Sequence, residues 1–146
     1  EIDINPPEGS SYETRYLQFP FPSSVITQDL SSSFAGKCHA LLGRPFHKGR
    51  DWFDFLWYIS RKIPVNLNFL KNALFQAGPW KGQTISLSKI WLSEALIDKI
   101  QIINWKSTVQ DLSPFLKKAE LQGLDLWSVE FFSDFAQRIQ VSKLDT

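Results

Sequence analysis

One stretch, residues 34–57, constrains this chain most, because it has the periodicity of two consecutive helices yet carries charged side chains among apolar ones. At helical spacing Lys37 and Arg44 stand on one stripe of the first helix, and Asp51 and Asp54 share a stripe of the second. A short connection containing Pro and Gly separates the two helices. We therefore expect a tight helical corner in which two cations face two carboxylates.

Length and composition limit the class of protein. With 146 residues, 43% of them hydrophobic, the chain can bury a core, and an aromatic content of 14% favours large rings in a core or interface over a disordered chain. A formal net charge of +1 argues against a general polyanion-binding surface. No apolar run approaches the roughly 20 residues of a membrane span, so we expect a soluble protein that does not enter a membrane.

The thiol and imidazole groups exclude two further kinds of site. A single cysteine, Cys38, rules out an internal disulfide and indicates a reducing compartment, the cytoplasm. His39 and His47 lie at no metal-ligand spacing with it, which excludes a Cys/His zinc site. We expect Cys38 to be a core residue and the two histidines to be structural.

The order of patterns predicts an α+β fold, with a small antiparallel sheet at the N-terminus followed by a predominantly helical bundle. Segments rich in strand formers and separated by prolines lie at residues 1–5, 12–19 and 24–27. Helical periodicity then predicts helices over 29–42, 50–62, 66–75, 86–100 and 125–140, with a short helix capped by Asp111 or Ser113 and a frayed tail from Val141 onward.

Within these helices the apolar positions, Leu30, Ile90 and Leu126 among them, are expected to face a shared core. We divide the chain into a strand-rich end, a charged helical pair and a C-terminal helical region, at residues 1–28, 29–62 and 63–146.

The charged corner allows two interpretations. Lys37 among apolar neighbours requires a carboxylate, a phosphate or an exit to water, and Arg44 beside it suits a polyphosphate. Asp51 and Asp54 can bind a divalent metal, orient a cation or transfer a proton. Alternatively the corner is an ion-paired structural joint, with Asp51 in the first turn of its helix beside Arg44 or Arg50.

The same residues carry a resemblance to a known family. A Lys-x-x-Ala-x-x-x-Arg segment precedes an Arg-Asp-x-x-Asp segment, and the positions that match are Lys37, Ala40, Arg44, Arg50, Asp51 and Asp54. In order and spacing, together with the opening residues 1–7, these segments resemble the nucleotidyltransferase-like toxins of the AbiEii/AbiGii abortive-infection type.

This resemblance implies a toxin-like enzyme that uses Mg²⁺ to transfer a nucleotide from a nucleoside triphosphate (NTP) to tRNA, another RNA or a protein, beside a cognate antitoxin. A homo-oligomer is compatible with it, and the small sheet would be the remnant of a nucleotidyltransferase sheet. The implied roles are catalysis by Lys37 and Asp51, phosphate binding by Lys37, Arg44 and Arg50, acidic support by Asp54, and metal binding by Asp3 on a strand.

One departure from the family pattern qualifies the implied activity. The first motif, a Gly-Ser or Gly-Gly turn followed by an Arg and an Asp-x-Asp pair, does not occur in these 146 residues. We therefore expect the chain to be the C-terminal part of a larger enzyme, inactive by itself and holding no cofactor tightly. The competing hypothesis is a non-enzymatic helical interaction module whose Lys/Arg/Asp corner is a structural joint.

Overall fold

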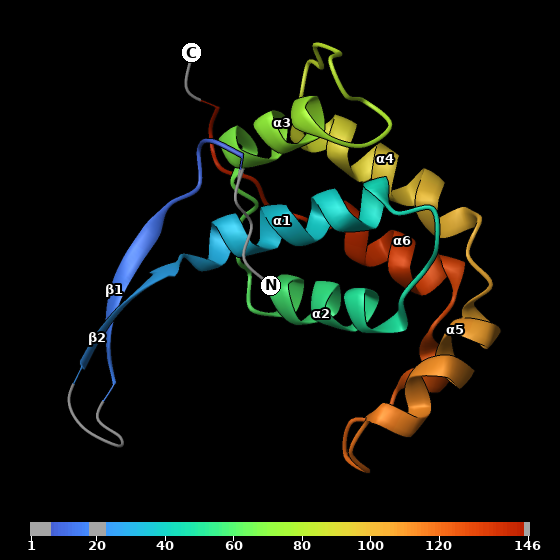
Figure 1. Cartoon of the computed structure of the whole chain (residues 1–146). Coiled ribbons are helices and arrows are strands. Elements are labelled where there is room, and N and C mark those ends of the chain that lie inside the picture. The colour runs from blue at the N-terminus through green and yellow to red at the C-terminus, as the bar shows by residue number, and fades with distance from the viewer. Residues whose placement is uncertain (1–6, 18–22, 145–146) are drawn as a thin grey trace.

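The computed structural model describes residues 7–17 and 23–144, which form a helical body and a two-stranded hairpin (Figure 1). The elements are β1 (Tyr12–Leu17), β2 (Ser23–Gln28), α1 (Leu30–Gly43), α2 (Gly49–Ser60), α3 (Leu67–Gln76), α4 (Lys89–Gln101), α5 (Trp105–Leu112) and α6 (Val129–Gln137), with 3₁₀ turns at Ser113–Phe115 and Leu124–Leu126. The predominantly helical character is confirmed, whereas the α+β class is only loosely supported. The expected strand at residues 1–5 lies outside the described residues.

Helix α1 is the central element of the body. In Figure 1 it lies between α2 on one side and α3 with α4 on the other, and α6 packs against α4. The hairpin projects away from this body, with β1 and β2 antiparallel and Tyr12 opposite Gln28. The charged stretch therefore lies inside the helical body.

The predicted helix starts at Asp29 and Asn66 are confirmed, and the helix predicted from residue 86 begins after Ser88; a side chain caps each of these three starts. Asp29, Asn66 and Ser88 each accept a hydrogen bond from the backbone N–H three residues later, at the beginning of α1, α3 and α4. Such a cap satisfies one of the backbone donors that the first helical turn leaves unpaired.

The predictions for the last third of the chain are partly wrong. Helix α5 begins after the cap Asn104, whereas the sequence predicted a short helix capped by Asp111 or Ser113. Pro114 lies instead in the 3₁₀ turn that follows α5, where its missing N–H costs no hydrogen bond. Helix α6 begins after Ser128 and is shorter at both ends than the predicted 125–140.

The predicted frayed tail is also wrong for the residues that the structure describes. Val141 forms a parallel bridge with Val65, and the Ser142 N–H donates to the Val65 carbonyl over 2.9 Å. The Ser142 hydroxyl accepts from the Leu67 N–H over 3.1 Å. The tail thus closes against the segment that leads into α3.

The segment before β1 is held by hydrogen bonds to α1 and α3. Asn66 donates from Nδ2 to the Gly9 carbonyl over 2.9 Å and to the Ser32 hydroxyl over 3.0 Å. Gly9 has a φ of +95°, and a Cβ there would lie 3.0 Å from the backbone nitrogen of Phe69. Both conditions favour glycine at this contact.

An aromatic cluster joins α2, α5 and α6. The rings of Trp105 and Phe132 stack with centroids 4.1 Å apart, and Trp52 meets both edge-on at about the same spacing of 5.4 and 5.5 Å. The Trp105 indole donates to the Ile100 carbonyl, so the buried polar end of this ring is satisfied. This cluster fixes the start of α2, where Asp51 lies.

No helix among the described residues has the length and apolar character to cross a bilayer.

Candidate functional site

Five charged side chains from α1, α2 and their connection meet at one corner, and we call them the charge cluster: Lys37, Arg44, Arg50, Asp51 and Asp54. The Lys37 Nζ lies 2.7 Å from Asp51 Oδ1 and 3.1 Å from Asp54 Oδ2. The predicted arrangement of cations facing carboxylates across the corner is therefore present. Three cations against two carboxylates leave the charge cluster with one net positive charge.

Asp51 is the centre of the charge cluster. Its side chain is 8% exposed, and its two oxygens are divided between Lys37 and the Arg44 guanidinium. It lies in the first turn of α2, where the helix dipole favours a negative charge. Burying a carboxylate is costly unless cations pair with it, and Lys37 and Arg44 provide this pairing.

Asp54 and Arg50 form the outer part of the charge cluster. Asp54 is 34% exposed, and the Arg50 Nε stands 3.7 Å from its Oδ1, one helical turn away. Arg50 itself is 68% exposed. Because this pair is solvated, it contributes little to stability, but it leaves a guanidinium free to meet a ligand.

The environment of Lys37 favours its charged form. Partial burial alone would lower the pKa of the ammonium group, but the hydrogen bonds and charges of Asp51 and Asp54 outweigh burial and raise that pKa above 10.5. Lys37 is therefore a permanent cation in the corner, a suitable phosphate contact and a poor general base.

Close packing against α5 sets the position of α2. A Cβ at Gly49 would lie 3.0 Å from the Leu112 Cβ and 3.1 Å from the Thr108 carbonyl oxygen, so a larger residue in the first turn of α2 would require α5 to shift by a few tenths of an ångström. At the other side of the connection, the Arg44 N–H donates to the Ala40 carbonyl and ends α1. These two contacts hold Arg44 opposite Asp51.

Two residues beside the charge cluster were not predicted from the sequence. The Lys99 Nζ of α4 donates to the Arg44 carbonyl over 2.8 Å, a contact between distant segments that no local pattern predicts. Tyr58 stacks on Phe34 with centroids 4.7 Å apart; burial raises the pKa of its phenol, and the Lys37 charge partly offsets this. Tyr58 stands four residues after Asp54, and that helical spacing could have identified it.

The described residues do not fit a Mg²⁺ site by themselves. They contain no group of three or more His, Cys, Asp or Glu side chains that could hold a metal. Both oxygens of Asp51 already contact cations, and Asp54 also faces Lys37. Asp3, the predicted metal ligand, lies outside the described residues. Carboxylates beyond the charge cluster would have to supply the metal ligands.

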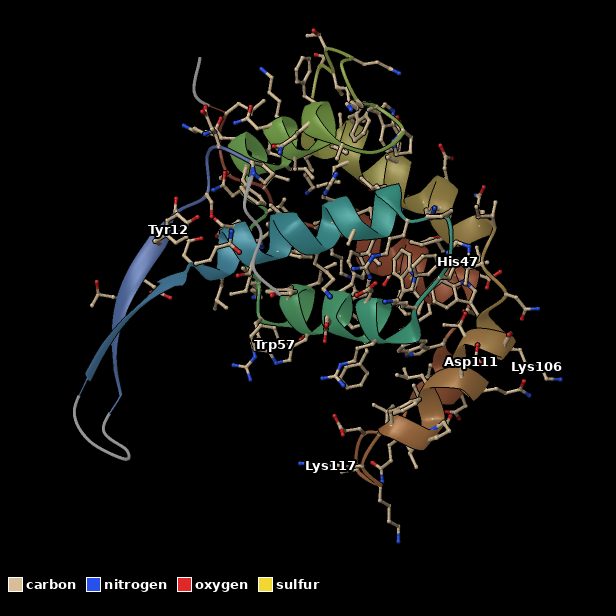
Figure 2. The ribbon with its side chains drawn as sticks, viewed as in Figure 1. Tyr12, His47, Trp57, Lys106, Asp111 and Lys117 are labelled. Carbon is tan, nitrogen blue, oxygen red and sulfur yellow. The ribbon has the colours of Figure 1, made fainter. Side chains whose placement is uncertain are left out.

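The cysteine and the two histidines lie outside the charge cluster. Cys38 is fully buried, which raises the pKa of its thiol and confirms it as a core residue. The Nε2 of His39 lies 2.9 Å from the Ala77 carbonyl and joins α1 to the loop after α3. His47 lies in the connection between α1 and α2 (Figure 2), and burial together with the Lys99 charge lowers its pKa.

Comparison with known proteins identifies the family that the charge cluster indicated. The family described as nucleotidyl transferase AbiEii toxin, of type IV toxin–antitoxin systems, matches residues 1–137. Separate comparisons with curated proteins and with solved structures found no match. The match covers the hairpin, the charge cluster and all six helices of the described chain. The chain therefore belongs to the AbiEii nucleotidyl transferase toxin family.

Proposed function

We propose that this chain takes part in transferring a nucleotide from an NTP to an acceptor, RNA or protein, with the charge cluster as the phosphate-binding wall of the site. Lys37, Arg44 and Arg50 supply the positive charge. Asp51 fixes Lys37 and Arg44 in position, and Asp54 supports Lys37 and Arg50. Phosphoryl and nucleotidyl transfer depend mainly on positioning and charge neutralisation, which such a wall provides.

The observation that carries this proposal is the surplus of positive charge at a partly solvated corner in a chain of this family. Arg44 is 38% and Arg50 68% exposed, so both guanidinium groups can reach a ligand while remaining next to their carboxylates. A guanidinium offers planar paired donors that match phosphate oxygens. In this proposal Mg²⁺ is bound by carboxylates other than Asp51 and Asp54, Asp3 among them.

The proposal extends to the rest of the enzyme. Residues 1–146 do not contain the complete first motif, in which an Arg and an Asp-x-Asp pair follow a Gly-Ser or Gly-Gly turn, so we expect these residues alone not to transfer a nucleotide. We divide the chain into a strand-rich end, a helical pair and a region of C-terminal helices, at residues 1–28, 29–62 and 63–146. We also propose that the protein acts in the cytoplasm and has a cognate antitoxin.

A second candidate function follows from the ion pairs themselves. Each oxygen of Asp51 has a cation as partner, and Lys37 contacts both carboxylates, as expected for a structural joint in a helical interaction module. On this view the charge cluster holds α1 against α2 and binds no nucleotide.

A matched pair of arginines separates the two functions. Arg50 and Arg138 are both exposed, at 68% and 61%, and each faces an aspartate one helical turn away. Arg50→Ala is expected to weaken binding of NTPs to the full-length protein about tenfold, whereas Arg138→Ala leaves it unchanged. Binding measured by isothermal titration, with folding checked by thermal unfolding, tests this. If both variants bind NTPs like the unmodified protein, the charge cluster is a joint.

A further inference from the structure

A cavity lies beside α4, and it is lined by none of the five residues of the charge cluster. It has a volume of about 410 Å³ and is lined by side chains of α1, of α4 and of the loop between α3 and α4, among them Trp80, Trp91, Glu94, Asp98 and Ile102. Family membership and nucleotide transfer assign no role to this cavity.

The indole rings form a rigid aromatic wall. Trp80 and Trp91 meet edge-on with centroids 5.4 Å apart, and both are partly exposed. The loop that carries Trp80 is held by backbone hydrogen bonds, from the Gly82 N–H to the Phe75 carbonyl and from the Gln83 N–H to the Trp80 carbonyl. The arrangement of the two rings is therefore preformed by the fold.

The opposite wall is acidic. Glu94 and Asp98 are exposed, stand one helical turn apart on α4, and have no ion-pair partner among the residues that the structure describes. The lysine that lines the cavity, Lys99, donates its ammonium hydrogen bond to the Arg44 carbonyl, and this contact engages it with α1. The cavity thus combines two unpaired carboxylates with aromatic rings, a combination that attracts a cation and repels an anion.

Exposed apolar side chains on α4 favour a ligand larger than a free ion. Ile90 and Ile102, at the two ends of α4, are each 70% exposed, although the opposite face of the helix is completely buried at Leu92, Leu96 and Ile100. Ile102 lines the cavity, and Ile90 lies at the other end of the same helix. Exposed apolar side chains on a helix that also lines an acidic, aromatic cavity are typical of a protein-binding surface.

We propose that this surface of α4 binds a basic segment of a partner protein. Two basic side chains of that segment pair with Glu94 and Asp98, and one of these two, an arginine or a lysine, lies against the Trp80 and Trp91 rings. These carboxylates are separated by four residues, a rise of about 6 Å, which matches two cations four residues apart on a partner helix. Apolar residues of the same segment cover Ile90 and Ile102. The proposal does not depend on nucleotide transfer.

The test uses an N-acetylated, alanine-based helical peptide with two arginines four residues apart and a leucine at each end. Its binding is followed through the indole N–H signals of Trp80 and Trp91 in nitrogen-15 NMR spectra, assigned with Trp80→Phe and Trp91→Phe. We expect both signals to shift on addition of the arginine peptide and to remain in place when glutamates replace the arginines.

The double variant Glu94→Gln with Asp98→Asn is expected to weaken the peptide about tenfold or more. The control, Asp125→Asn with Glu130→Gln, removes the same charge from exposed acidic positions elsewhere and is expected to leave the affinity unchanged. Equal weakening by both double variants, or indole signals that do not respond to the peptide, would overturn the proposal. So would N-acetylarginine amide that binds as tightly as the peptide, because the cavity would then be a site for a small cation only.

Discussion

Asp51 shows how one buried side chain determines the geometry of the corner. It is the only carboxylate of the charge cluster that is almost completely buried, and both of its oxygens are used. Lys37 and Arg44 retain contact with water, so these two cations depend less on Asp51 than Asp51 depends on them. A substitution at this position therefore alters contacts of both α1 and α2.

We predict that Asp51→Ala lowers the free energy of unfolding by about 2–3 kcal/mol, because it leaves two partly buried cations without their shared acceptor. The exposed pair Asp134 and Arg138 provides the control, since Asp134→Ala is expected to cost about 0.5 kcal/mol or less. Urea unfolding measures both. Similar losses in the two variants would mean that burial of Asp51 adds nothing to its ion pairs.

Stability is predicted to decline at alkaline pH. The pKa values of Cys38, Tyr58 and Lys37 are all raised in the folded protein above 9.0, 10.0 and 10.5 respectively. A raised pKa favours the protonated form in the fold, so its contribution is complete below the ordinary pKa and is lost as pH rises above it. Thermal unfolding from pH 7 to 11 is expected to show a midpoint that falls from about pH 9 upward.

Two variants check the origin of this decline. Tyr58→Phe retains the ring that stacks on Phe34 but removes a titrating group, so the midpoint should fall less steeply between pH 9 and 11 than in the unmodified protein. Tyr12→Phe, at a ring that is 59% exposed, is the control. An identical slope in all three proteins would contradict the assignment to Tyr58.

The ion pairs of the corner were largely predictable at this scale, because helical spacing alone puts Lys37 and Arg44 on one stripe and Asp51 and Asp54 on another. The spacing could not show which cation meets which carboxylate. It also could not show that Leu30, Ile90 and Leu126 are exposed, since apolar periodicity does not reveal whether another element covers a given face.

At the scale of the helices, capping explains which helix starts were predicted correctly from the sequence and which were not. Asp29, Asn66 and Ser88 lie directly before strongly periodic stretches, and the helices begin there. In the last third, several candidate caps compete, and Ser128 caps α6 although Asp125 precedes it. The choice between them depends on tertiary packing of Trp127 and Phe132, which local sequence does not encode.

A comparison of two asparagine caps tests the tertiary contribution. Asn66 caps α3 and also donates to the Gly9 carbonyl and the Ser32 hydroxyl, whereas Asn104 caps α5 from an exposed position. We predict a loss of about 2–3 kcal/mol in the free energy of unfolding for Asn66→Ala and about 1 kcal/mol for Asn104→Ala. Chemical unfolding of the two variants decides it; equal losses would show that the additional bonds of Asn66 contribute nothing.

For the molecule as a whole, the aromatic cluster is the part that unites the helices. Phe132 is completely buried and its ring contacts Trp52, Trp105 and Trp127. Phe132→Ala is predicted to cost about 3–5 kcal/mol and to change the tryptophan fluorescence of the folded protein, since three indoles lose a neighbour. Phe115→Ala, at a ring 77% exposed, is expected to stay within about 0.5 kcal/mol of the unmodified protein.

The exposed aromatic side chains at this scale require a different explanation from the buried ones. Trp57 projects from the end of α2 away from α5 (Figure 2), and the Arg61 guanidinium lies over its ring at 4.5 Å. Such a ring contributes little to the core and is partly shielded from water by the arginine stem. High aromatic content thus predicted large rings in a core or an interface, and it did not identify which rings, such as Trp57, are exposed.

The bridge between Val65 and Val141 has a consequence for how the protein is made. Residues near the middle of the chain obtain their last backbone partners from residues close to its end. A ribosome synthesises from the N-terminus, so α1 and α2 emerge well before Gln140 and Ser142 can form their hydrogen bonds with Val65 at the entrance to α3. Helices α1 and α2, which carry the charge cluster, therefore form early, but the helical body around them can close only after residue 142 has left the ribosome.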